Sequence, residues 1–79
     1  MNNQLKNTAR EAIGHFQTLP DDVLAAIVRG DLNAVALAAR ELQSRGLDQH
    51  GEWVGFSKAP SVHRRALSAQ PELEHLQPF

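Results

Sequence analysis

The hydrophobic residues near the start of the chain have the spacing of one face of a helix. They follow one another at steps of four, three, one and three residues: Leu5, Ala9, Ala12, Ile13 and Phe16. Charged and amide side chains occupy most of the opposite side. Such a stripe is typical of an amphipathic α-helix. We therefore predict a first helix from about Asn3 to Gln17.

The next segment, TLPDD (residues 18–22), has the composition of a helix start. Proline suits the first helical turn, and acidic side chains there interact favourably with the positive end of the helix dipole. We expect Thr18 or Leu19 at the cap position, with Thr18 supplying the better capping side chain. The VLAAIV run that follows is apolar almost all round, which predicts a largely buried second helix that ends at Arg29 and Gly30.

A third helix is predicted from a capping residue, Asp31 or Asn33, to Arg45. Gly46 then stands where helices often end in a left-handed residue, a conformation that glycine adopts without steric cost. Alanines make one side of this helix thin, so we expect it to pack closely against the second helix. Three helices joined by short loops indicate an all-α fold, a small bundle of three to four short helices.

After Gly51 the pattern changes to EWVGF (residues 52–56), which is too short for a helix and too rich in glycine for a long strand. We interpret it as an extended turn after the third helix that folds back over the bundle. A weak fourth helix is predicted from about Ala59 to Ala69, with Ser57 as its cap. The chain is thus expected to form a single helical domain over residues 1–70, followed by a mobile tail over residues 71–79.

The composition excludes several classes of function. The 79 residues carry a formal net charge of −1, which gives no overall attraction to nucleic acid or acidic membranes. Without cysteine, no disulfide, thiolate nucleophile or cysteine-ligated zinc site can form. No apolar run approaches the roughly 20 residues of a membrane span, and the polar N-terminus is unlike a signal peptide. We expect a cytoplasmic protein.

No residue pattern indicates catalysis, a cofactor or a metal. The serines lie in no nucleophile-elbow motif, and the glycines form no phosphate-binding loop. The carboxylates of Asp21 and Asp22 are explained by the helix start. The histidines lack the spacing of metal ligands on one helix, and His50 beside Asp48 and Glu52 is interpreted as a turn residue. We therefore predict a non-enzymatic protein with no cofactor and no metal site.

A basic segment is the first candidate for partner binding. Residues 57–70 contain no acidic side chain, so the local potential is positive although the whole chain is slightly acidic. Such a segment suits a phosphate or an acidic protein surface, and the ordinary alternative is a solvated helix face. Its candidate contact residues are Lys58, His63, Arg64 and Arg65.

The aromatic residues of the EWVGF segment are the second candidate. Trp53 and Phe56 follow a glycine turn and need a hydrophobic surface to cover. They are either lids over the helical core or anchors of a contact surface, where aromatic and arginine side chains carry much of the binding free energy. Both interpretations remain open on the sequence.

The second and third helices, joined at Gly30-Asp31, also have the length of a helix-turn-helix. A DNA-reading helix carries polar or basic side chains at its exposed N-terminal positions. Here those positions hold the sequence NAVA (residues 33–36). We therefore favour an ordinary helical hairpin and keep a small, dimeric DNA-binding regulator as the alternative function.

From Asp31-Leu32-Asn33 through LAARELQSRGLDQHGEWVGF, the chain resembles a short module of small uncharacterised proteins from bacterial plasmids, phages and integrated elements. In that module an alanine-rich helix ends in SRGLD and is followed by G-x-W-V-G-F. The resemblance covers about residues 23–57, and residues 58–79 depart from it. It implies no activity. It does imply the mobile gene pool, in which short proteins of the anti-CRISPR and anti-restriction type act by binding a host or rival complex.

The principal hypothesis is a small interaction protein that binds, and inhibits or modulates, a nucleic-acid-processing protein or ribonucleoprotein complex of the host. Direct contact with nucleic acid is the weaker expectation, and no membrane is involved. A further alternative is that residues 23–57 are only a folding or dimerisation module, whose exposed alanine faces pair two chains. A homodimer is compatible with each hypothesis. The expected contact residues are Trp53, Phe56, Lys58, His63, Arg64 and Arg65.

Overall fold

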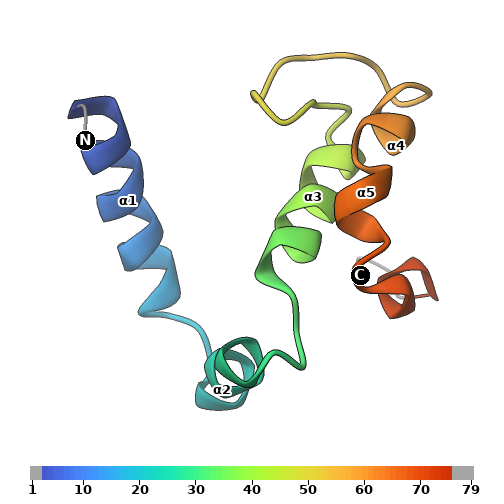
Figure 1. The fold of residues 1–79 in the computed structure, drawn as a ribbon. Coiled ribbons are helices and arrows are strands. Elements are labelled where there is room, and N and C mark those ends of the chain that lie inside the picture. Colours follow the sequence, from blue (N-terminus) through green and yellow to red (C-terminus); the bar gives the residue numbers. More distant parts are fainter. Residues whose placement is uncertain (1–2, 76–79) are drawn as a thin grey trace. The chain divides into compact units, whose positions relative to one another are not determined.

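The computed structural model describes residues 3–75, and the regular secondary structure within them is helical, with no strand. The predicted all-α fold is thereby confirmed. None of the helices in this part of the chain has the length and apolar composition needed to cross a membrane. In chain order the elements are α1 (Asn3–Phe16), α2 (Asp21–Arg29), α3 (Ala34–Ser44), α4 (Ala59–Val62), α5 (Arg64–Leu67) and the 3₁₀ helix η1 (Pro71–His75) (Figure 1).

The chain forms two compact units, Met1–Leu32 (unit 1) and Asn33–Phe79 (unit 2). The single domain expected over residues 1–70 remains a prediction. The division falls between α2 and α3 because α3 finds its packing partners, α4 and α5, later in the chain. The first part of the expected mobile tail forms η1, and Leu73 is buried, while the mobility of residues 71–79 remains a prediction. The remainder, residues 76–79, lies outside the described residues.

In unit 1, α1 has the predicted position, but α2 begins differently from the expectation. Pro20 is itself the N-cap of α2, and no side chain makes a capping hydrogen bond. The prediction of Thr18 or Leu19 as the cap is therefore wrong. The Thr18 hydroxyl instead donates to the His15 carbonyl (2.7 Å), so it provides a hydrogen-bond partner for a carbonyl at the end of α1. The predicted end of α2 at Arg29 and Gly30 is confirmed, and Gly30 adopts the left-handed conformation (φ 87°).

The expectation that α2 is largely buried is also wrong. None of residues 4–32 is buried, and Val28 is 87% exposed. The physical reason is the size of unit 1, because two short helices can cover each other along one side only. The apolar composition of α2 therefore leaves hydrophobic surface exposed.

In unit 2, the side chain of Asn33 fixes the start of α3. Its Oδ1 accepts a hydrogen bond from the backbone N–H of Ala36 (3.0 Å), which confirms one of the two predicted caps. The backbone N–H of Asn33 donates to Oε1 of Gln70 (2.7 Å). The beginning of α3 is thereby tied to the residue that precedes η1.

The alanine-rich side of α3 packs against α5 and α4. We expected the second helix as its partner, but the segment after the loop takes this place in unit 2. Small side chains allow these short helices to approach one another closely. The buried side chains of this core are Ala36, Ala39, Ala59, His63 and Leu73, and Gly46 at the end of α3 is buried as well.

The predicted fourth helix, Ala59 to Ala69, is interrupted at His63 and forms the two short helices α4 and α5. Its N-cap is Lys58 in place of Ser57. At the interruption His63 has φ −99° and ψ 6°, outside the helical range. The ring of His63 is buried at this point, so the bend accompanies the inward placement of the side chain.

Candidate functional site

The candidate site begins where α3 ends. Gly46 adopts the left-handed conformation (φ +71°), as predicted. Its N–H donates to the Gln43 carbonyl (3.0 Å), and the N–H of Leu47 donates to the Leu42 carbonyl (2.9 Å). These two bonds form a Schellman motif, which satisfies carbonyls that the helix end would leave without partners. The chain leaves α3 in a fixed direction.

Backbone hydrogen bonds then close the segment after Gly46 into a loop. Leu47 and Trp53 form an isolated antiparallel bridge. The carbonyl of Gly46 accepts hydrogen bonds from the N–H groups of both Val54 (2.9 Å) and Gly55 (3.1 Å). The expected fold-back after Gly51 is therefore present, and its partner is the chain directly after α3. We call residues 46–56 the Trp–Phe loop.

The side chain of Asp48 holds the turn of the Trp–Phe loop from inside. Its Oδ1 accepts hydrogen bonds from the backbone N–H groups of His50 (2.9 Å) and Glu52 (3.0 Å). The bond from Glu52, and next that from His50, lowers the pKa of the Asp48 carboxyl below its ordinary value. Both bonds favour the charged carboxylate.

Acidification is expected to destabilise this turn. A carboxyl whose pKa is lower in the folded state stabilises the fold above its unfolded pKa of about 3.9, and this contribution is lost as the pH falls through the folded pKa. Between about pH 6 and pH 3, the Tm of the natural sequence should therefore fall further than that of Asp48→Asn. Glu11→Gln, which removes a carboxylate outside the loop, should retain the full acid-induced fall. Equal falls for the natural sequence and Asp48→Asn would contradict the assignment.

Trp53 and Phe56 lie together on this loop. Their ring centroids are 5.1 Å apart and their planes meet at 88°, an edge-to-face arrangement. The six-membered ring of Trp53 also lies directly over Gly46, since a Cβ built on this glycine would be 2.5 Å from Cζ3 of the ring. Even so, Trp53 and Phe56 are 63% and 64% exposed. Trp53 thus covers Gly46, and the pair presents most of its hydrophobic surface to solvent.

Of the predicted basic contact residues, His63 is placed differently from the others. It is 4% exposed, and its Nε2 lies 2.7 Å from the carbonyl oxygen of Leu47, so the ring contributes to the interior of unit 2. We expected it on the basic surface. Its bond joins the bend between α4 and α5 to the base of the Trp–Phe loop. The side chains of Lys58, Arg64 and Arg65 are exposed.

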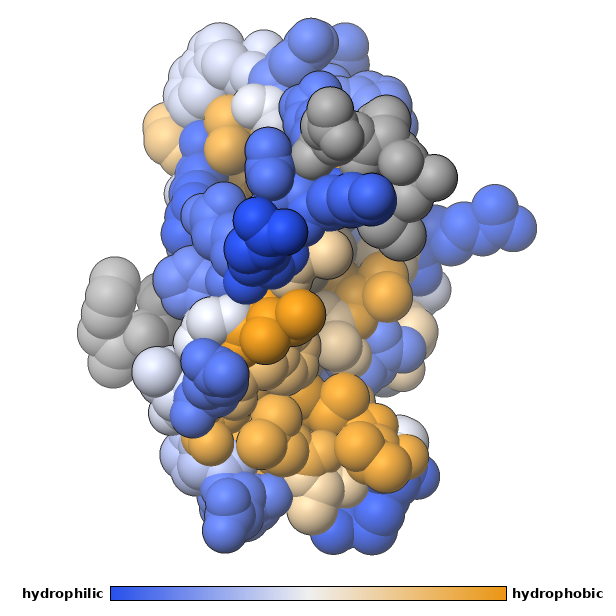
Figure 2. Space-filling view, turned by 90° about the vertical axis from the view of Figure 1, so that its left-hand side faces the viewer, coloured by the Kyte–Doolittle hydropathy of each residue, from blue (hydrophilic) through white to orange (hydrophobic). Residues whose placement is uncertain are grey.

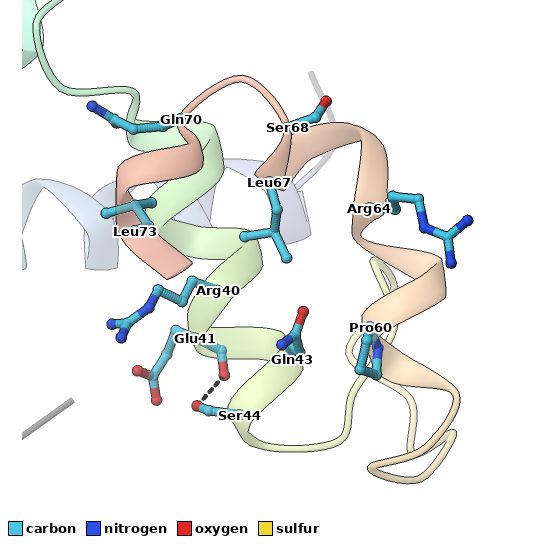
Figure 3. A pocket seen from close by; sticks show the side chains of 10 residues that line it. All are labelled: Arg40, Glu41, Gln43, Ser44, Pro60, Arg64, Leu67, Ser68, Gln70 and Leu73. Carbon is cyan, nitrogen blue, oxygen red and sulfur yellow. Dashed lines mark hydrogen bonds between the residues drawn. The ribbon is translucent and has the colours of Figure 1, made fainter. Parts of the chain in front are cut away.

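A groove of about 550 Å³ runs between α3 and the α4–η1 segment, and Arg64 contributes to its lining. In Figure 3, Gln43 and Leu67 point into the gap, whereas the guanidinium of Arg64 points away from α3. Oε1 of Gln43 is buried beside this groove and has no hydrogen-bond partner among residues 3–75. This groove could not be predicted from the sequence, because the residues that line it come from segments about twenty positions apart, 40–44 and 60–73.

Residues 3–75 contain no group of three or more histidine and acidic side chains close enough to hold a metal ion. The site offers a surface: a fixed aromatic pair, the exposed basic side chains of Lys58 before α4 and of Arg64 and Arg65 on α5, and a groove lined in part by Arg64. A comparison of the chain with protein-family models, with curated proteins and with solved structures finds no match.

Proposed function

We propose that this protein is a non-enzymatic binding protein that occupies a surface of a larger nucleic-acid-processing complex of a bacterial host. The observation that carries the proposal is the Trp53–Phe56 pair. Its two aromatic side chains are 63% and 64% exposed, although the backbone that carries them is fixed by hydrogen bonds. Large exposed apolar groups of this kind mark interaction sites on soluble proteins, and tryptophan is enriched among residues that dominate binding.

The Trp–Phe loop supports this proposal because its backbone is already held in one conformation before a partner binds. Association costs free energy when loops and side chains become ordered, and a surface that is already ordered avoids most of this cost. In the Trp–Phe loop, Gly46 and Asp48 fix the backbone, and Trp53 rests on Gly46. Aromatic side chains add little to the ordering cost because they have only two rotatable bonds.

The choice of partner rests on two further features. The exposed Lys58, Arg64 and Arg65 suit a partner that carries acidic groups or phosphates. The resemblance of residues 23–57 to proteins of plasmids and phages suggests an inhibitor or modulator of a host defence complex, of the anti-CRISPR or anti-restriction type. In this arrangement the aromatic pair supplies the hydrophobic anchor and the basic side chains orient it.

Binding to a nuclease-treated bacterial lysate tests the proposal. The full chain, immobilised, should retain a defined complex that quantitative mass spectrometry identifies, and Trp53→Ala should retain at least about tenfold less of it, as is typical of a binding hot spot. Val35→Ala is the matched control, because Val35 is an exposed apolar residue of α3 (68% exposed) outside the loop. Equal retention by Trp53→Ala and the natural sequence would remove the aromatic pair from the mechanism.

The alternative function, a DNA-binding regulator, makes a different prediction. The purified protein would shift duplex DNA at low salt, with an affinity that falls steeply as salt is added. Arg64 and Arg65 lie on α5, a helix of only four residues, Lys58 precedes α4, and the N-terminal part of α3 exposes Val35. These features favour the protein-binding hypothesis, for which we expect no duplex shift.

A further inference from the structure

The hollow on unit 1 and the groove on unit 2 differ in the ligands that they can distinguish. Figure 2 shows hydrophobic side chains gathered in the lower part of the view. The hollow on unit 1 is lined by Ala9, Ala12, Ile13, Phe16, Gln17 and Leu24, none of which is charged. Precisely placed polar groups give a binding site its specificity. The groove on unit 2 has such groups, and we call it the α3–α5 groove.

The apolar part of the α3–α5 groove comes from the segment after the Trp–Phe loop. Pro60, Leu67 and Leu73 line it. Leu73 is 4% exposed and Leu67 is half-buried, and in Figure 3 the side chain of Leu67 points into the gap. The volume of about 550 Å³ lies within the range of roughly 300–1,000 Å³ that is typical of ligand sites. The groove can therefore enclose an apolar side chain of a ligand.

The side chain of Gln43 gives the α3–α5 groove a hydrogen-bond acceptor that residues 3–75 do not use. Its Oε1 is buried without a partner among them, although the side chain lines the groove and points into the gap (Figure 3). A buried acceptor without a partner destabilises the folded state, so folded proteins contain few of them. Because the last side-chain torsion of glutamine has broad preferences, the amide can turn its oxygen towards a donor in the groove.

The charges of the α3–α5 groove favour an anionic ligand. Arg40 of α3 and Arg64 of α5 both line it. Glu41 is the one acidic side chain among the lining residues that the structure describes, and its Oε2 already lies 2.8 Å from Nε of Arg45. The guanidinium of Arg64 is exposed and points away from α3 in Figure 3, so a ligand would meet it at the outer edge of the groove. A carboxylate at this edge would be attracted.

The geometry points to an acidic peptide segment as the ligand of the α3–α5 groove. An apolar side chain of the peptide packs on Leu67, a backbone N–H donates to Oε1 of Gln43, and a neighbouring carboxylate pairs with Arg64. A peptide supplies all three groups close together, because every residue except proline carries an N–H donor. Arginine suits the last contact, since its planar guanidinium binds carboxylates through two parallel hydrogen bonds. The site goes beyond the proposed function, because it does not use Trp53 or Phe56.

A phage-displayed library of random heptapeptides, selected on the immobilised full chain, tests the site. Enriched peptides should carry aspartate or glutamate beside a large apolar residue. In calorimetric titrations with a synthetic enriched peptide, Arg64→Glu should raise Kd at least about tenfold, because like charges then face each other. Arg65→Glu is the matched control, since it reverses an exposed charge of the same helix outside the groove lining and should leave Kd unchanged. Trp53→Ala should leave Kd unchanged as well, which separates this site from the Trp–Phe loop.

Gln43→Met tests the acceptor, because methionine has a similar length and no amide. Kd for the peptide should rise roughly three- to tenfold, the value of one net hydrogen bond. The Tm of the free protein should rise too, since a buried acceptor without a partner is removed. A purely structural amide would instead give a lower Tm and an unchanged Kd, and that result overturns the proposal. So does a selection that enriches no acidic peptides, an equal Kd for Arg64→Glu and Arg65→Glu, or peptide binding that Trp53→Ala abolishes.

Discussion

Replacing Gly46 with alanine is expected to lower the free energy of unfolding by about 2–4 kcal/mol, the largest single effect of a methyl group that we expect in this chain. Two causes add. At φ +71° the left-handed conformation destabilises an L-residue with a side chain by about 1–2 kcal/mol. The new Cβ would also lie 2.5 Å from the ring of Trp53, so the ring must move. Urea denaturation measures the loss, and the fluorescence of the single tryptophan should report the displaced ring.

Gly51→Ala is the matched control for this substitution. Gly51 belongs to the same loop and has nearly the same backbone angle (φ +76°), but a Cβ there meets no atom within 4 Å. It should therefore show the backbone cost alone, with little change in the fluorescence of Trp53. In the double variant Gly46→Ala/Trp53→Ala, part of the cost of the alanine should disappear because the clash is gone. Equal losses for Gly46→Ala and Gly51→Ala, with unchanged fluorescence, would show that the ring does not rest on Gly46.

Local signals in the sequence were sufficient for both ends of α3, although they misplaced the caps of α2 and α4. Gly46 predicted the end of α3, and Asn33 was one of two residues proposed to cap its start. Both act through hydrogen bonds within a few residues along the chain, so the relevant partners are visible in the sequence. The fold-back after Gly51 followed for the same reason.

Packing partners were harder to predict than boundaries. The apolar composition of α2 indicated burial, but composition cannot show whether enough neighbouring surface exists to enclose a helix. Similarly, the alanines of α3 indicated close packing without identifying α4 and α5 as the partners. The bond between Asn33 and Gln70 joins residues 37 positions apart, and neither residue carries a signal for the other.

The candidate site shows the same contrast between what local sequence signals predict and what depends on packing. Trp53 and Phe56 were identified as a pair of interest, but the sequence left open whether they cover a core or face solvent. The structure places them at the surface, on a loop that needs Gly46 beneath the larger ring. His63 was grouped with basic neighbours because it stands beside Arg64 and Arg65, although its short side chain turns inward at the bend between α4 and α5.

His63→Ala is the second substitution for which we expect a large loss, about 2–4 kcal/mol in the free energy of unfolding. The ring is 4% exposed, so its removal leaves a cavity in a core that otherwise consists mainly of small side chains. The Leu47 carbonyl also loses the ring Nε2 that lies 2.7 Å away. Because Leu47 pairs with Trp53 across the base of the Trp–Phe loop, the fluorescence of Trp53 should change as well.

Two further variants separate the hydrogen bond of His63 from its packing. His63→Gln keeps a side-chain N–H that can donate to the Leu47 carbonyl, whereas His63→Leu fills similar space without a donor. If the bond matters more than the volume, His63→Gln should be the more stable of the two, because a buried carbonyl without a partner costs about 1–3 kcal/mol. Arg65→Ala, an exposed change two residues away, should stay within about 0.5 kcal/mol of the natural sequence. A loss for His63→Ala no larger than that of Arg65→Ala would show that His63 does not hold the loop to the α4–α5 bend.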